Sequence, residues 1–230
     1  MARRLTGSAR RLAILEAAAP VFARLGRDGA TTGDIAKAAG ISEALLYKHF
    51  ASKDALYAAL ETHCVEAMEI ANHLFEGAEP SAETFILAAA VTMHAVFVGI
   101  GDQEAHETTK RLVVSSLLSD GAFAGAFLQK QMVPWVGLFR DSLEAARLAG
   151  DVEADGEPSA DMGVWFLHHL ATSLHLFSLP GIEVVPYGAD RVRLADRAIR
   201  FVLRGMGFKS SVVNRYYSVE RMESIIKGKA

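Results

Sequence analysis

The sequence contains a single cysteine, Cys64, in 230 residues. One thiol excludes a disulfide within the chain and any metal site built from a cysteine cluster. It also fits a reducing compartment, so we expect a cytoplasmic protein. The histidines His168, His169 and His175 are accompanied by no clustered carboxylate, and His169 lies on a different helix face from the other two. We therefore expect no bound metal.

Long hydrophobic runs are also lacking. The longest, residues 86–100, contains a threonine and a histidine and is too short to cross a bilayer. Arg10 and Arg11 precede an apolar stretch that has the outline of a signal peptide, but Glu16 interrupts it. Its apolar residues recur at the spacing of one helix face, namely Leu12, Leu15, Ala19, Phe22 and Leu25. We expect an amphipathic helix there and no membrane segment, with a cleaved signal peptide as the alternative.

Motifs for catalysis are missing as well. The sequence has no GxSxG motif, no glycine-rich phosphate loop and no paired-carboxylate motif. The acid-rich segment 151–161 has the composition of a solvated loop. We therefore expect no enzymatic activity and no cofactor.

Strand signals are nearly absent, and the one exception, residues 182–185, ends at Pro186. The composition is 51% hydrophobic and 22% charged, which is typical of a globular protein. The sequence predicts an all-α fold, with a kink at Pro134 and irregular chain over residues 206–217. The predicted helices span residues 8–25, 32–40, 42–50, 52–75, 81–100, 102–118, 122–149, 160–178, 189–205 and 219–227.

Charge is distributed unevenly along the chain. The net charge is −3, but residues 1–56 contain nine Lys and Arg and five Asp and Glu, a net charge of +4. The remaining residues therefore have a net charge of −7. A basic N-terminal segment on an acidic body is typical of a small head that binds a polyanion.

Residues 31–54 carry the most informative pattern. They predict two short helices joined by a turn at Gly40, whose glycine permits left-handed backbone. The predicted N-caps of the first four helices are Ser8, Thr32, Ser42 and Ser52. The residues expected to face inward are Ile35, Ala36, Ala39, Ile41, Leu46 and Phe50. Two capped helices joined by a glycine turn indicate a helix-turn-helix.

The second helix of this pair is short enough to enter a DNA major groove, where the N-terminal residues of a recognition helix meet base edges. Hydroxyl, imidazole and ammonium groups at its margins suit phosphates, and Thr32, Tyr47, His49 and Lys53 are expected to contact them. The predicted DNA-binding residues are Thr32, Ser42, Glu43, Ala44, Leu45, Tyr47, Lys48, His49 and Lys53. A helical hairpin packed for structure alone is the alternative.

This stretch resembles the DNA-binding head of the TetR/AcrR family of bacterial regulators. The shared pattern consists of Thr31, Thr32, Ile35, Ala36, Ala39, Gly40, Ile41, Ser42, Leu46, Tyr47, His49, Phe50, Ser52, Lys53 and Asp54. The match covers residues 9–60, and the rest agrees in helix number, length and order. The resemblance implies a three-helix helix-turn-helix DNA-binding head over residues 1–56 and a larger helical ligand-binding and dimerisation body over residues 57–208. Residues 209–230 form a C-terminal tail with a short helix.

Three positions depart from the family pattern, namely Glu43, Ala44 and Leu45. Family members often carry a basic or neutral residue, a glycine or proline, and a small hydroxyl residue there. A carboxylate accepts a hydrogen bond from cytosine N4, and a leucine contacts a thymine methyl. The operator sequence is therefore not transferable from relatives.

The resemblance implies that helices 160–178 and 189–205 pair with the same helices of a second copy. Apolar stripes on both helices are compatible with such pairing. The stripes consist of Val164, Leu167, Ala171, Leu174, Phe177 and Ser178, and of Val192, Ala195, Ile199, Val202 and Met206. Burial of these stripes within one subunit is the alternative.

The resemblance also implies an effector site among the middle helices. Aromatic and apolar walls with a few polar groups suit small molecules, although plain core has the same composition. The candidate ligand-binding residues are Met68, His94, Phe97, Val114, Leu118, Trp135, Phe139, Trp165, His168 and His169.

We therefore expect a sequence-specific DNA-binding transcriptional regulator. Its expected partners are a palindromic operator in double-stranded DNA, a second copy of the chain in a homodimer, and a small hydrophobic effector that releases it as a repressor. The alternative is an all-α small-molecule-binding protein or enzyme that no longer binds DNA. Retention on random duplex DNA at low salt distinguishes the two.

Overall fold

The computed structural model describes residues 6–66, 75–100, 103–153, 159–179 and 182–226. Within these ranges the regular structure is helical, and β-structure is confined to an isolated antiparallel bridge between Val152 and Phe208. The predicted all-α fold is thus confirmed. No helix in the described ranges is long and apolar enough to cross a membrane.

The chain divides into two compact units. Unit 1 comprises Met1–Ile70 and Glu104–Gln131, and unit 2 comprises Ala71–Gln103 and Met132–Ala230. Residues 104–131 thus pack with the N-terminal helices, although they follow them at a distance in the sequence. The domain boundaries expected after residues 56 and 208 stay predictions.

Unit 1 begins with four helices whose starts are set by side-chain caps: α1 (Gly7–Gly29), α2 (Thr32–Ala38), α3 (Glu43–His49) and α4 (Lys53–Glu66). The caps predicted at Ser42 and Ser52 are confirmed, because their hydroxyl oxygens accept hydrogen bonds from the backbone of Leu45 and Ala55 at 3.2 and 3.0 Å. The caps predicted at Ser8 and Thr32 are wrong by one or two positions, since Thr6 and Thr31 take those roles.

The start of α2 is a capping box. Asp34 accepts hydrogen bonds from the Thr31 backbone at 3.1 Å and from the Thr31 hydroxyl at 2.6 Å, while Thr31 caps the Asp34 backbone. The Thr31 bonds lower the pKa of the Asp34 carboxyl. This reciprocal arrangement explains why Thr31, one residue earlier than predicted, begins the helix.

The core of unit 1 is formed by α1 to α4 together with α6 (Gln103–Leu117) and α7 (Ala122–Gln131). Phe22 of α1 meets the Tyr57 ring of α4 edge-on, with centroids 4.9 Å apart. Leu46 and Phe50 are buried, as predicted for the inward face of α3. Each large apolar side chain buried in this way contributes about 1.5–3 kcal/mol. The result is a short helix, α3, held to the core by one face only.

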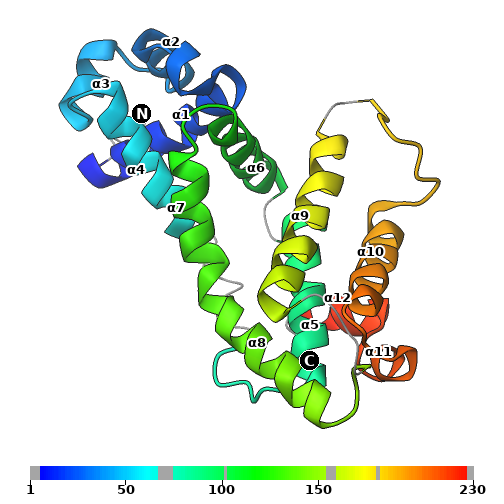
Figure 1. Ribbon diagram of the computed structural model, residues 1–230. Coiled ribbons are helices and arrows are strands. Elements are labelled where there is room, and N and C mark those ends of the chain that lie inside the picture. Colours follow the sequence, from blue (N-terminus) through cyan, green and yellow to red (C-terminus); the bar gives the residue numbers. More distant parts are fainter. Residues whose placement is uncertain (1–5, 67–74, 101–102, 154–158, 180–181, 227–230) are drawn as a thin grey trace. The chain divides into compact units, whose positions relative to one another are not determined.

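Unit 2 is built around α5 (Ala82–Met93), which continues into a π-helical turn, η2 (His94–Val98). Figure 1 shows the helices that pack against α5, which are α8 (Val133–Leu148), α9 (Ala160–Ser178), α10 (Arg191–Gly205), α11 (Ser210–Tyr216) and α12 (Val219–Ile226). The alanines at positions 88–90 are buried, and their small side chains permit this close packing on several sides.

The single helix predicted over residues 122–149 is two helices. Helix α7 ends at Gln131, and α8 begins at Val133 with Pro134 in its first turn. Proline has no backbone N–H and clashes with the preceding turn inside a helix, but the first turn of a new helix tolerates it. Pro134 therefore starts a helix here instead of kinking one.

The C-terminal region is more ordered than predicted. Residues 206–217, expected to be irregular, contain α11, and its Val212 and Val213 are buried. The helix predicted over 219–227 is confirmed as α12, where Arg221 forms an ion pair with Glu83 of α5. The local sequence did not predict α11, because so short a helix is stabilised by its packing, here against α5.

Candidate nucleic-acid interface

The turn between α2 and α3 depends on Gly40, whose φ is +62°. The backbone N–H groups of Gly40 and Ile41 donate to the carbonyl oxygens of Lys37 and Ala36 at 3.2 and 2.9 Å. Such bonds close the C-terminus of a helix when a glycine takes the left-handed conformation. The predicted role of Gly40 is confirmed, and the turn fixes α3 against α2.

We expect Gly40→Ala to lower the free energy of unfolding by about 1–2 kcal/mol, because left-handed backbone is strained for any residue with a Cβ. A Cβ at this position meets no atom within 4 Å, so the strain is the only cost. Gly125→Ala is the matched control: it also meets no atom, but it lies inside α7. There alanine should stabilise by up to about 1 kcal/mol. Urea unfolding of both variants measures the difference, and equal effects would contradict the strain.

Helix α3 presents an outward face of mixed chemistry. Ser42, Glu43, Ala44, Tyr47 and Lys48 are exposed, while Leu45 and His49 are half-buried. The exposed set lies on the first turn and along one side of the helix, which is the part of a recognition helix that meets base edges. Ser42 uses its hydroxyl oxygen as the helix cap.

Three side chains of the predicted site are bonded to one another. The Thr32 hydroxyl donates to Glu43 Oε2 at 2.7 Å, and the Tyr47 hydroxyl donates to Thr32 Oγ1 at 3.4 Å. The bond from Thr32 holds the Glu43 carboxylate at the start of α2 and uses the one hydroxyl proton of Thr32. A phosphate contact by Thr32 or a base contact by Glu43 therefore requires this network to open, and both roles stay predictions.

Lys53, predicted to contact phosphate, is half-buried and bonded within the protein. Its ammonium donates to the carbonyl oxygens of Asp28 and Ala30 at 3.3 and 3.1 Å. These bonds tie the start of α4 to the end of α1, so Lys53 has a structural role in this conformation. Lys48 is exposed on α3 and is the cation of the predicted set that faces solvent.

Sequence reasoning missed Arg11, which supports the recognition helix from α1. Its guanidinium donates to the backbone oxygen of His49 at 2.6 Å and lies 4.0 Å from the centroid of the Phe50 ring. A cation that bonds the last carbonyls of a helix stabilises that end. The positive charge of residues 1–56 indicated that this region binds a polyanion, but it did not distinguish Arg11 from the other basic residues.

A second overlooked residue, Arg27, joins three parts of unit 1. Its guanidinium forms ion pairs with Asp54 of α4 at 2.9 Å and with Asp120, between α6 and α7, at 3.0 Å. It also lies 5.5 Å from the Tyr57 ring centroid. Exposed ion pairs contribute little stability one by one. Their position, however, links α6 and α7 to the helices that hold α3.

The predicted ligand-binding residues are spread over both units. Val114 is half-buried on α6, and Leu118, just beyond α6, is 84% exposed. In unit 2, His94, Phe97, Phe139 and His168 are buried, Trp135 and Trp165 are half-buried, and His169 is exposed. Met68 lies outside the described residues.

Some of these unit 2 residues do lie together. The Trp165 ring is 6.0 Å from His168 edge-on and 6.1 Å from His169 in a stacked arrangement, centroid to centroid. Phe139 meets Phe85 of α5 at 5.1 Å. The His94 ring bonds the Ala90 carbonyl oxygen at 2.9 Å, and burial lowers its pKa. Such contacts occur both in a packed core and in the walls of a ligand pocket. The ligand-binding role of these residues therefore stays a prediction.

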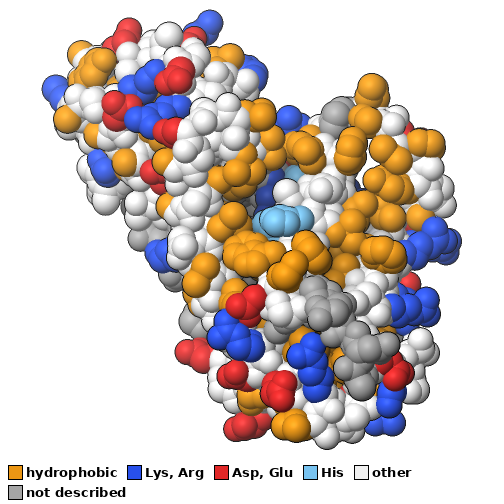
Figure 2. Space-filling model, in the orientation of Figure 1, with side chains coloured by type: hydrophobic (Ala, Val, Ile, Leu, Met, Phe, Trp, Pro, Cys, Tyr) orange, Lys and Arg blue, Asp and Glu red, His pale blue; other side chains and the backbone are white. Residues whose placement is uncertain are grey.

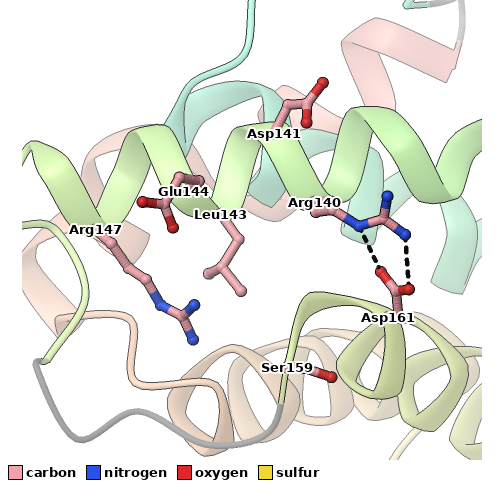
Figure 3. A pocket seen from close by; sticks show the side chains of 7 residues that line it. All are labelled: Arg140, Asp141, Leu143, Glu144, Arg147, Ser159 and Asp161. Atoms are coloured by element: carbon pink, nitrogen blue, oxygen red, sulfur yellow. Dashed lines mark hydrogen bonds and ion pairs between the residues drawn. The ribbon is translucent and has the colours of Figure 1, made fainter.

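A pocket of about 420 Å³ lies between α8 and the start of α9 (Figure 3). Most of its lining residues are charged, and Arg140 holds Asp161 through two hydrogen bonds of 3.1 and 2.7 Å. The lining residues are Arg140, Asp141, Leu143, Glu144, Arg147, Ser159 and Asp161. None of the predicted ligand-binding residues lines this pocket.

The predicted dimerisation stripes are mostly buried within unit 2. Val164, Leu167, Ala171 and Leu174 of α9 are covered, as are Ala195, Ile199, Val202 and Met206 of α10 and its end. A Cβ added at Gly163 of α9 would lie 2.3 Å from the Met206 side chain, which shows how closely these helices approach. Burial within one subunit, the alternative considered above, accounts for these residues.

A different apolar face of α9 and α10 is exposed. On α9 it consists of Met162, Phe166, Leu176 and Phe177, which recur along one side of the helix. On α10 the exposed member is Phe201, with 74% of its surface accessible. Figure 2 shows hydrophobic side chains gathered over α9 and the loop that follows it. Of the predicted stripes, Phe177 lies on this exposed face, and pairing through α9 and α10 stays a prediction.

Residues 14–60 match the family model of bacterial regulatory proteins of the tetR family. The N-terminal part of the chain is thus similar to the DNA-binding domain of that family. The matched range runs from within α1 to within α4 and includes the whole of α2 and α3. No curated protein matches the sequence.

Solved structures extend the likeness in fold to the rest of the chain. The ketosteroid transcriptional regulator KstR2 of Mycobacterium tuberculosis has a TM-score of 0.60 at 20% identity, over 90% of this chain and 100% of its own. AibR, in complex with isovaleryl coenzyme A and operator DNA, has a TM-score of 0.59 at 16% identity, over 87% and 100%. GusR of Salmonella enterica has a TM-score of 0.53 at 20% identity, over 86% and 95%. The likeness in fold to these regulators thus extends over both units.

Proposed function

We propose that this protein is a regulator of the TetR family and acts as a homodimeric repressor. Two copies of α3 bind the half-sites of a palindromic operator, and a small hydrophobic effector releases the protein from DNA. It acts in the cytoplasm and has no catalytic activity. The observation that carries the proposal is α3 itself, a short helix anchored by Leu46 and Phe50 with its other face exposed.

The shape and chemistry of α3 support DNA binding. A major groove admits an α-helix, and the first residues of that helix meet base edges. Here those residues are Glu43, Ala44 and Leu45. Ala44 has a methyl side chain that permits close approach, and Leu45 suits a thymine methyl. Tyr47 and Lys48 extend the exposed face toward the flanking phosphates.

The exposed face of α9 and α10 supports dimerisation. Phe166 and Phe201 are large apolar side chains left open to solvent in a single chain. A second copy would cover them through a two-fold interface, in which each residue is used twice. Two heads related by a two-fold axis match a palindrome, whose half-sites lie about one helical turn apart or a multiple of it.

An effector is supported by the aromatic content of α8 and α9 and by related structures. AibR is described with isovaleryl coenzyme A and operator DNA in one complex, and KstR2 is named as a ketosteroid regulator. In this chain Trp135, Phe139 and Trp165 supply aromatic walls, and His168 supplies a polar group. Effector and operator binding should oppose each other by roughly 5- to 150-fold, the usual range of allosteric coupling.

Selection of bound sequences from random duplex DNA tests the proposal. We expect a palindromic consensus whose affinity falls steeply as salt rises, because counterions are released on binding. Each half-site should contact one α3. The absence of retention on any duplex at low salt would leave the alternative, a helical small-molecule-binding protein.

We expect Tyr47→Ala to weaken binding to operator and random DNA by the same factor, roughly tenfold, because a hydroxyl on phosphate reads no sequence. The dependence of affinity on salt should not change, since no charge is lost. Tyr187→Ala, at an exposed tyrosine in the loop after α9, is the control. Fluorescence anisotropy measures both, and a changed sequence preference would contradict the phosphate contact.

A further inference from the structure

The face that α3 turns toward solvent carries an acid, which is unexpected on a surface that meets a polyanion. Five acids lie in residues 1–56. Asp34 belongs to the capping box of α2, and Asp54 pairs with Arg27, so both have a structural role. Glu43 instead lies exposed in the first turn of α3, where a recognition helix meets base edges. A carboxylate close to phosphates is repelled by them, so its presence there needs a reason.

Glu43 is held against the first turn of α2. Its Oε2 accepts the hydrogen bond that the Thr32 hydroxyl donates at 2.7 Å. Its Oε1 lies close to the next residue of α2, since a Cβ built on Gly33 would be 3.5 Å from that oxygen. Tyr47 adds a third link, because its hydroxyl donates to Thr32 Oγ1 at 3.4 Å. The three side chains thus form a chain of hydrogen bonds that runs from α3 to α2 and back to α3.

The Thr32 hydroxyl serves one acceptor at a time. A threonine hydroxyl carries a single proton, whereas a carboxylate accepts several hydrogen bonds. While Glu43 accepts that proton, a phosphate cannot take it. Thr32 is not needed to begin α2, because Thr31 caps the helix. Its hydroxyl can therefore change partner without disturbing the fold, but the change leaves the Glu43 carboxylate without this donor.

We propose that Glu43 makes binding selective for a cytosine in each half-site of the operator, by exchanging its hydrogen bond from Thr32 for one from the cytosine amino group. Cytosine presents N4 as a donor in the major groove, and an acid accepts from it. Adenine also presents an amino group, but its N7 acceptor lies beside that group and repels a carboxylate. The exchange with cytosine releases the Thr32 hydroxyl to a phosphate.

This exchange couples base recognition to backbone contact. The correct base frees a hydroxyl for a phosphate, whereas a wrong base leaves Glu43 and Thr32 bonded to each other and the acid close to the DNA backbone. Glu43 therefore weakens binding to random DNA, and specificity is obtained by disfavouring the wrong sequence. The inference rests on the DNA-binding function proposed above, and it assigns the base that one residue of α3 reads.

Selection of bound sequences with the wild type, Glu43→Gln and Glu43→Ala tests the assigned base. The wild type should select a C·G pair at one position of each half-site. Glu43→Gln should select A·T at that position, because a glutamine bonds adenine N6 and N7. Glu43→Ala should show no preference there, and the rest of the consensus should not change. A wild-type consensus that survives both substitutions, or preferences that change at scattered positions, would overturn the assignment.

Anisotropy titrations on the selected operator and on a random duplex of the same length test the exchange. We expect Glu43→Ala to bind the random duplex roughly tenfold tighter than the wild type does, because an acid near phosphates is lost and Thr32 is released. It should bind the operator no tighter. Glu16→Ala, at an exposed acid of α1, controls for a general loss of negative charge and should bind both duplexes within about twofold of the wild type. Unchanged or weaker binding of Glu43→Ala to the random duplex would overturn the exchange.

Thr32→Val removes the hydroxyl and keeps the branched shape of the side chain. In the wild-type background it should weaken the operator complex roughly tenfold and the random complex less than about threefold, because Thr32 reaches a phosphate only on the operator. In the Glu43→Ala background the two losses should become equal. Thr62→Val, at an exposed threonine of α4, should bind both duplexes as the wild type does. Equal losses in the wild-type background would contradict the coupling.

Failure of this inference is distinguishable from failure of the proposed function. A wild type that binds no duplex at low salt would disprove DNA binding itself. A wild type that selects an operator, but whose consensus and ratio of operator to random affinity do not respond to substitution of Glu43, would disprove only the role of Glu43.

Discussion

Phe201→Arg is expected to convert the protein to monomers and to lower its affinity for the operator by at least about 100-fold. Phe201 is the exposed large apolar residue of α10. A two-fold interface would bury the Phe201 side chain of both protomers. Each copy loses about 1.5–3 kcal/mol of apolar burial and gains a charge that must be desolvated. Arginine is a sharper choice than glutamate, because Arg197 and Arg204 lie one turn to either side and would neutralise an acid.

Leu148→Arg is the matched control. Leu148 is 81% exposed at the end of α8 and is not one of the residues of the face proposed for pairing. Sedimentation equilibrium should give a dimer for the wild type and the control and a monomer for Phe201→Arg. A wild type that remains monomeric at micromolar concentration, or a variant that remains dimeric, would disprove the interface. Charges at Leu174 or Ile199 are no test of it, because both residues are buried in the subunit and their replacement would unfold it.

The local features of the DNA-binding unit could be predicted because each has a signal within a few residues. Ser42 and Ser52 cap helices through hydrogen bonds to backbone three positions on. Gly40 has the positive φ that the turn requires. Leu46 and Phe50, four residues apart, are both buried. Periodicity and capping act over one turn of helix, so the sequence alone specifies them.

Tertiary partners could not be predicted in the same way. Arg27 bonds Asp120, which is 93 positions away in the sequence. Lys53, an exposed cation in the sequence pattern, bonds carbonyl oxygens at the end of α1. Any long cationic side chain reaches several surfaces, and only the folded chain decides which one it meets. The same limit applies to α11, which is stabilised by its packing on α5.

The two faces of α9 show why an interface is harder to predict than a core. Val164, Leu167 and Leu174 are buried against the subunit, whereas Met162, Phe166 and Phe177 are exposed. Both sets are apolar and both recur with helical spacing. A helix that is apolar on two sides predicts burial on both, without specifying which side meets the same chain. The structure separates them because it covers one set and leaves the other open.

Ala44→Glu is expected to lower operator affinity by at least about 100-fold while the fold stays intact. Ala44 is exposed in the first turn of α3, directly after Glu43. A second carboxylate in the groove would lie among phosphates and base edges with no counter-charge, which costs several kcal/mol. The same acid near a helix N-terminus is favourable for folding. Loss of DNA binding should therefore occur without loss of stability.

Two further substitutions separate the possible reasons for such a loss. Ala44→Gln has nearly the same shape as Ala44→Glu without the charge, and it should retain most of the affinity if repulsion dominates. Ala126→Glu places the same acid on an exposed position of α7 and should bind the operator as the wild type does. Anisotropy titrations and urea unfolding of all three variants provide the comparison. If Ala44→Glu remains dimeric and binds operator with wild-type affinity, then α3 does not enter the groove, and the exposed face of this helix has another purpose.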